Sequence, residues 1–196
     1  ILWGVLSNAF FGIQLSMDNP LRKFSLVQWM VEKKAAYHIV HQDETWKEWI
    51  KEFPNLELVK DPSTFLKEGV KEEKGHQAYA IYDKFADNVM FELALFIGVV
   101  HIIISIMRNL YRNIGGIGWI LCIIGAYLYI PYYLNATSLI HYIFGVNKVT
   151  APDNGIYLMI AGAGFATAYA IYKHKVLGAL EPMHGIQIFS DTMSYL

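Results

Sequence analysis

The residues best placed to do chemistry lie in residues 185–196, where polar side chains recur along an apolar segment. Four of them stand at positions i, i+3, i+4 and i+7 and would share one face of a helix: Gln187, Ser190, Asp191 and Ser194. His184 extends this polar stripe by one turn toward the N-terminus. Because polar groups are costly to expose to lipid, we expect the stripe to face water, a cavity or a partner helix. The third environment would be ordinary interhelical hydrogen bonding.

Two further ionisable residues lie in the apolar run 89–107. His101 stands near its middle and is a possible intramembrane polar partner, or a neutral imidazole that hydrogen-bonds to a neighbouring helix. Glu92 stands near one end, where water could solvate it. Nine residues separate the two, so on a helix they point to opposite faces. The sequence therefore does not predict that they pair with each other.

Other kinds of site find little support in the sequence. His38 and His41 could share a helix face, but no Cys or clustered carboxylate completes a metal site around them. The apolar runs contain neither a His-Glu-x-x-His nor a Gly-x-Ser-x-Gly pattern, and no phosphate-binding loop follows a strand. We therefore expect no catalytic residue, no metal and no cofactor. The net charge of −1 argues against a nucleic-acid partner.

The uneven distribution of charge predicts which elements must position these residues. Residues 17–88 hold 11 of the 16 Lys and Arg residues and 13 of the 17 Asp and Glu residues, which predicts an external, mainly helical soluble segment. The rest is apolar. We predict an all-α fold, a polytopic membrane helical bundle with this helical external segment. The membrane segments would be a truncated helix at 1–16, three spans at 89–107, 117–134 and 155–172, and the start of a polar-striped helix at 180–196.

Within the external segment, three local signals predict helix starts. Asn19-Pro20 precedes apolar residues at helical spacing, Asp43 is placed to cap a helix that ends at Pro54, and Asp61-Pro62 opens another. A charged helix is expected to continue through residues 67–74.

Positive charge predicts the orientation of the spans. Arg108 and Arg112 follow the first complete span, and Lys173 and Lys175 follow the third, so both pairs lie at one end of the bundle. The positive-inside rule makes that end cytoplasmic. Segments 17–88 and 135–154 are then external, and the closing helix enters from the cytoplasm. Small residues at i, i+4 and i+8 in the third span predict close helix packing: Gly162, Ala166 and Ala170.

Three stretches of the chain resemble segments of one known family. Phe189-Ser-Asp-Thr-Met-Ser-Tyr-Leu196 resembles the motif that opens the penultimate membrane helix of the membrane stator subunit of V/A-type rotary ATPases, called subunit a or subunit I. Ile97-Gly-Val-Val-His101 resembles its Gly-Ile/Val-x-His segment, and Leu2-Trp-Gly-Val-Leu-Ser-Asn-Ala-Phe-Phe-Gly12 resembles a preceding span. The order of spans fits as well. Since the chain opens and closes inside apolar patterns, we read it as an internal fragment of the membrane domain.

The resemblance implies a subunit that conducts H+ or Na+ and performs no bond chemistry itself. In the family, an arginine that follows Ser-Tyr-Leu faces a carboxylate on a ring of proteolipid subunits, and two half-channels load and unload the ion. Ser190, Asp191 and Ser194 would line the cytoplasmic half-channel, with Gln187 and His184 nearer its mouth. The implied partners are the proteolipid rotor ring, the peripheral stalk, other ATPase subunits and the lipid bilayer. The implied location is a bacterial or archaeal cell membrane, with an organelle membrane as the alternative.

Two other functions stay open on the sequence. A secondary transporter would use Asp191 and His101 as a proton or substrate relay near the membrane midplane. A membrane scaffold would use the same polar residues only to hold helices together.

Overall fold

A computed structural model describes residue 4 and residues 9–10, 13–14, 19–73 and 76–175. The chain divides into two compact units, Ile1–Phe91 and Glu92–Leu196. The described residues are mainly helical, and three helices are long and apolar enough to cross a membrane. The predicted all-α membrane fold is therefore confirmed. The predicted span at 180–196 lies outside the described residues.

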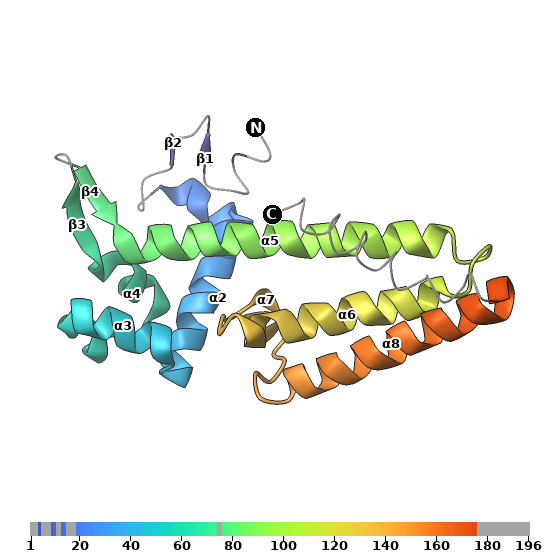
Figure 1. Ribbon diagram of the computed structural model, residues 1–196. Helices are drawn as coiled ribbons and strands as arrows, with labels where there is room; N and C mark the ends of the chain where they lie inside the picture. Colours follow the sequence, from blue (N-terminus) through green and yellow to red (C-terminus); the bar gives the residue numbers. More distant parts are fainter. Residues whose placement is uncertain (1–3, 5–8, 11–12, 15–18, 74–75, 176–196) are drawn as a thin grey trace. The chain divides into compact units, whose positions relative to one another are not determined.

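The first unit consists of short helices and two small strand pairs (Figure 1). Its helical elements are η1 (Pro20–Phe24), α2 (Leu26–His41), α3 (Glu44–Glu52), η2 (Pro54–Leu58), α4 (Pro62–Glu68) and the start of α5 (Ala80–Arg108). Its strands are β1 (Ala9–Phe10), β2 (Ile13–Gln14), β3 (Val70–Glu73) and β4 (His76–Tyr79). Both strand pairs are antiparallel.

The helix starts in this unit follow from their capping residues. The Asp43 side chain accepts a hydrogen bond from Trp46 N at 3.2 Å and caps α3, and the Asp61 side chain accepts one from Thr64 N at 3.0 Å and caps α4. Both predicted starts are confirmed. At Asn19 the predicted start is a 3-10 turn, after which Ser25 caps α2 separately.

The predicted charged helix over residues 67–74 is wrong. The helix α4 ends at Glu68, and β3 then pairs with β4 in a register that places Val70 opposite Tyr79. Gly69 explains the break, because a Cβ atom there would lie 2.5 Å from the Ile81 side chain. The chain can pass this close to α5 only without a side chain, and it leaves the helical path at that point.

Residues 1–16, predicted as a truncated transmembrane helix, are described at a few positions only. Gly4 is helical, whereas Phe10 pairs with Ile13 and Ala9 with Gln14 in a short antiparallel ladder. The helix prediction fails at these two dipeptides, where an aromatic and a β-branched residue favour extended backbone. The other residues of this stretch lie outside the described part of the chain.

The core of the first unit forms where the start of α5 meets α2 and α4. Phe65, Ile81, Phe85 and Val89 have at most 1% of their surface exposed. The Phe85 ring lies 5.4 Å from the His38 ring and 6.5 Å from the Trp49 ring, measured between centroids. Apolar side chains thus point inward here, as in a water-soluble domain.

The second unit presents its apolar side chains outward. It contains α5 from Glu92 onward, α6 (Gly116–Tyr133), α7 (Leu139–Tyr142) and α8 (Ala151–His174). Ile104 on α5 is 59% exposed and Ile160 on α8 is 67% exposed. Large apolar side chains on the outer faces of long helices are typical of a lipid-facing surface.

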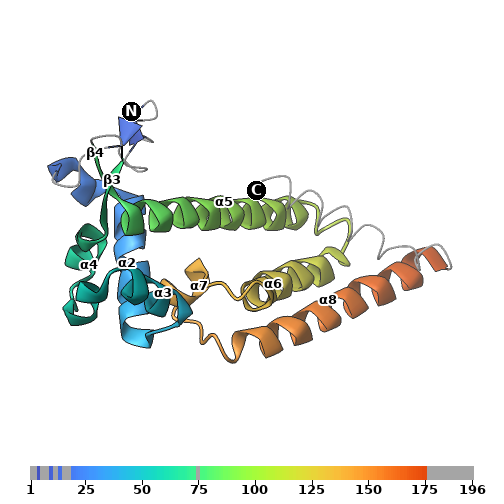
Figure 2. The ribbon, with the colours of Figure 1, turned by 60° about the vertical axis from the view of Figure 1, so that its left-hand side comes forward.

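The helices α6 and α8 lie side by side in both views (Figures 1 and 2). They approach closely because glycines face each other at two levels, Gly118 against Gly162 and Gly125 against Gly155. A Cβ atom at Gly162 would lie 2.5 Å from the carbonyl oxygen of Gly118. Ala166 and Ala170 are also buried, so the predicted small-residue packing in α8 is confirmed.

The basic residues that follow α5 and end α8 lie close together. The Lys173 ammonium donates a hydrogen bond to the Arg112 carbonyl oxygen at 3.3 Å, and a Cβ atom at Gly115 would touch the Tyr169 ring. The predicted clustering of positive charge at one end of the helices is confirmed. Along α5, Glu92 lies sixteen residues before Arg108, or about 24 Å at the rise of an α-helix.

Candidate functional site

The predicted ion pathway cannot be located on this structure. All five of its residues lie outside the described part of the chain: His184, Gln187, Ser190, Asp191 and Ser194. Their assignment to a half-channel stays a prediction from the sequence. The two other predicted polar residues, Glu92 and His101, are described, and both lie on α5.

Glu92 has a specific partner from a distant part of the sequence. The Tyr142 hydroxyl donates a hydrogen bond to Glu92 Oε2 at 2.7 Å. Tyr142 lies on the short helix α7 and is 8% exposed, and Glu92 is half-buried. Burial, and then the nearby Glu92 carboxylate, raise the pKa of Tyr142 well above its usual range. Its phenol therefore stays protonated and acts as a donor.

The segment that carries Tyr142 is held by a capping box. The His141 ring accepts a hydrogen bond at Nδ1 from the Ser138 backbone N–H at 3.1 Å, and Ser138 caps the short helix in return. Burial, and secondly the charge of Lys148, lower the pKa of His141. A neutral imidazole fits this position because Nδ1 must carry a lone pair. The helix α7 is thus fixed in the orientation that places Tyr142 at Glu92.

Aromatic rings enclose the same region. The Phe96 ring lies 6.1 Å from the Tyr127 ring and 6.0 Å from the Phe144 ring. Tyr127 on α6 interacts electrostatically with Glu92 and with Ser138. We call Glu92, Tyr127, Ser138, His141 and Tyr142 the Glu92 cluster. It lies at the end of the helices opposite Arg108 and places a carboxylate there that water reaches only in part.

His101 lies on a different face. It is exposed, as are Ile97 and Ile104 four residues before and three after it on α5. The nine-residue spacing turns it away from Glu92. The structure therefore places Glu92 in a polar cluster and leaves His101 on the outer apolar surface of the second unit.

The sequence pointed to Glu92 but missed its partners. Residues 135–154 read as an external loop, and a helix of four residues is too short to give a periodic pattern. The pattern Ser138-x-x-His141 was a usable signal, because it has the spacing of a capping box. Among the described residues, no group of three or more His, Cys, Asp or Glu side chains could hold a metal ion.

The chain is similar to known proteins along its entire length. It is 40% identical over 197 aligned residues to a protein named V-type ATP synthase subunit I from Chlamydia pneumoniae. It is 36% and 35% identical to proteins of the same name from Chlamydia muridarum and Chlamydia trachomatis. The chain spans 30% of the length of these relatives.

No family model matches the chain, and no solved structure does. The whole-chain similarity to these relatives agrees with the three helices suited to a membrane and with the motifs quoted above. On that evidence, this membrane protein chain is a homologue of a segment of V-type ATP synthase subunit I.

Proposed function

We propose that this chain belongs to the ion-translocating membrane subunit of a V-type ATP synthase in a bacterial membrane. The observation that carries the proposal is its 40% identity, over its whole length, to a protein of that name. A chain with this role conducts H+ or Na+ and leaves nucleotide chemistry to other subunits of the complex. Its partners are a proteolipid rotor ring, the peripheral stalk and the surrounding lipid.

The polar stripe of residues 184–194 lines the half-channel that opens to the cytoplasm. The spacing of Ser190, Asp191 and Ser194 supports this, because all three would share one face of an apolar helix. Lipid-facing positions would make these groups costly, whereas a water-filled path solvates them. Asp191 contributes a negative charge that attracts cations to the path.

The clustering of basic residues supports the orientation. Arg112 and Lys173 meet at one end of the second unit, and the positive-inside rule makes this end cytoplasmic. The Glu92 cluster then lies toward the external side. It places a half-buried carboxylate there, which the Tyr142 hydroxyl holds by a hydrogen bond.

The test is ion transport by the complete ATP synthase reconstituted in vesicles. We expect Asp191→Ala to reduce ATP-driven ion uptake about tenfold, equivalent to about 1.4 kcal/mol in the transport barrier. Assembly should survive, because the change removes a polar group from a water-filled path and not from a packed core. Uptake is followed with a pH-sensitive dye and, separately, as Na+ flux.

Asp153→Ala is the matched control, since Asp153 is exposed in the first turn of α8 and is not one of the residues of the stripe. It should leave uptake unchanged. Full coupling in an assembled Asp191→Ala enzyme would limit Asp191 to a structural role. Equal losses in both variants would point to a general effect of surface charge, and the assignment of the stripe would then fail.

A further inference from the structure

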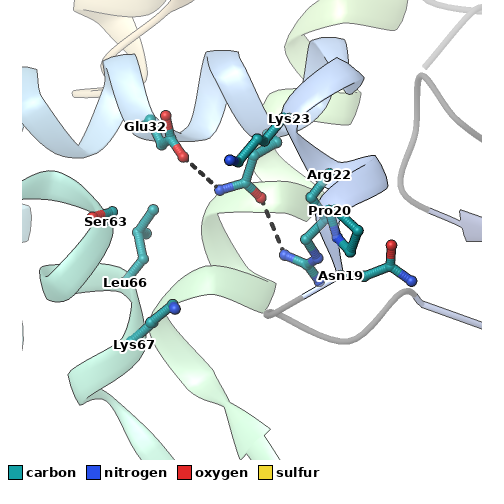
Figure 3. A pocket seen from close by; sticks show the side chains of 9 residues that line it. Asn19, Pro20, Arg22, Lys23, Glu32, Ser63, Leu66 and Lys67 are labelled. Carbon is teal, nitrogen blue, oxygen red and sulfur yellow. Dashed lines mark hydrogen bonds between the residues drawn. The ribbon is translucent and has the colours of Figure 1, made fainter.

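A pocket of about 350 Å³ opens in the first unit between η1, α2 and α4. It is lined by side chains from all three elements: Asn19, Pro20, Arg22, Lys23, Gln28, Glu32, Ser63, Leu66 and Lys67. Figure 3 shows Ser63, Leu66 and Lys67 on one side and Asn19, Pro20 and Arg22 on the other. The volume lies within the range of small-molecule sites, about 300–1,000 Å³.

Arg22 is the fixed cation of this pocket. It is only 5% exposed, and its Nη1 donates a hydrogen bond to Gln28 Oε1 at 3.1 Å. Its guanidinium lies 4.4 Å from the centroid of the Tyr82 ring. Asp83 on α5 interacts with it electrostatically. These contacts hold the guanidinium plane in place, so a ligand would find one donor group already ordered.

Two further cations reach the pocket from different elements. Lys23 comes from the end of η1, and Lys67 from the last turn of α4. Both are exposed and line the pocket, so a ligand there would meet their positive charge without entering the core. Bringing three like charges to one pocket is unfavourable, and an anion between them relieves this repulsion.

One carboxylate faces the same pocket. Glu32 accepts a hydrogen bond from Gln28 Nε2 at 2.8 Å, and Gln28 thereby links Glu32 to Arg22 (Figure 3). Three cations and one carboxylate line the pocket, and Asp83 partly offsets the charge of Arg22, so the lining remains positive. A phosphate monoester carries about −1.5 to −2 at pH 7 and offers more acceptor oxygens than a single carboxylate, so it suits a lining with several separate donors.

The polar neutral groups suit the same ligand. Ser63 and Asn19 add a hydroxyl and an amide at opposite sides of the pocket. The Asn19 side-chain oxygen accepts a hydrogen bond from Leu21 N–H at 3.0 Å, so its NH2 group is the part of the amide that can donate to a phosphate oxygen. The oxygens of a tetrahedral phosphate can accept hydrogen bonds from several such groups at once. We propose that this pocket binds a phosphate group, carried either by an anionic lipid or by a small soluble phosphate ester.

The test uses the full-length subunit, extracted in maltoside micelles that contain no phosphate. Inorganic phosphate is titrated into it by calorimetry at constant ionic strength, and the phospholipid that stays bound is measured as phosphorus per protein. The pocket variant is Lys23→Gln with Lys67→Gln. The matched control is Lys33→Gln with Lys60→Gln, two exposed lysines that do not line the pocket. All four positions are exposed, so neither pair of changes opens the core.

Two results would support the proposal and distinguish the sources of the phosphate. If the ligand is a soluble phosphate ester, the wild type and the control should bind inorganic phosphate saturably, with a Kd of about 1 mM. In the pocket variant alone this Kd should rise by about tenfold or more. If the ligand is an anionic lipid, phospholipid phosphorus should stay bound to the wild type and to the control but be lost from the pocket variant. The proposal is overturned if the wild type shows neither retained lipid nor saturable binding below about 10 mM. Equal losses in the control variant would also overturn it.

Discussion

The packing of α6 against α8 gives the sharpest prediction about stability, for Gly162→Ala. The added Cβ atom would lie 2.5 Å from Gly118 O and 2.6 Å from Cys122 N, and both are backbone atoms of α6. An ordinary contact needs 3.4 Å or more. Neither atom can move alone, so the two helices must separate by about 1 Å at this level, which loosens the dispersion contacts on both sides.

Overpacking of this kind costs about 1–3 kcal/mol. Alanine recovers part of it, because its helix propensity exceeds that of glycine by about 0.8–1.0 kcal/mol. We therefore expect Gly162→Ala to destabilise the full-length subunit by up to about 2 kcal/mol. The measurement is equilibrium unfolding in mixed micelles by titration with SDS, followed by tryptophan fluorescence, with helix content measured separately by circular dichroism.

Gly164→Ala is the matched control on the same helix. A Cβ atom there would meet nothing within 4 Å, so this change should be neutral or slightly stabilising. Helix content should stay the same in both variants, because a membrane helix keeps its own hydrogen bonds when its packing loosens. If Gly162→Ala proved as stable as Gly164→Ala, the close approach of α6 and α8 would be refuted.

Two further predictions concern the Glu92 cluster. Tyr142→Phe should destabilise the subunit by about 1–3 kcal/mol, because it removes the hydroxyl that donates to the half-buried Glu92 at 2.7 Å. In the same unfolding assay, the effects of Tyr142→Phe and Glu92→Gln should be non-additive in a double-mutant cycle. Strict additivity would exclude the contact. Burial lowers the pKa of His141 below 6.5, the value of an exposed imidazole, so protonation favours the unfolded chain. The stabilising contribution of the neutral imidazole is thus present above about pH 6.5 and decreases as the pH falls below it. Unfolding free energies at pH 7.5 and 5 should therefore differ more in the wild type than in His141→Gln, and an equal pH dependence would contradict this role.

Local signals in the sequence predicted the parts of the fold that local chemistry determines. Asp43 and Asp61 cap their helices because each side chain can reach a backbone N–H three residues on, whatever lies around it. The clustering of Arg112 and Lys173 followed from counting spans between them. Small residues in α8 indicated a packing face, since only small side chains allow such an approach.

Contacts between distant residues could not be predicted in this way. The helix expected over residues 67–74 had a suitable composition, but the proximity of Ile81 to Gly69 decides the local path of the chain. Nothing in the sequence pairs Glu92 with Tyr142, fifty residues later. The partners of Gly155 and Gly162 were likewise hidden, although Gly118 and Gly125 repeat their seven-residue spacing.

We propose that the polar stripe lines a water-filled ion path from the cytoplasm. The most direct test places single cysteines at Ser190 or at Ile188, in a Cys122→Ser background of the complete ATP synthase. Each is exposed to a thiol reagent that cannot cross the membrane, applied from the cytoplasmic side. We expect the cysteine at Ser190 to react and its modification to block ATP-driven ion uptake, whereas the cysteine at Ile188 should stay unreacted. An unreactive cysteine at Ser190, or a modified one that leaves uptake intact, would contradict the claim.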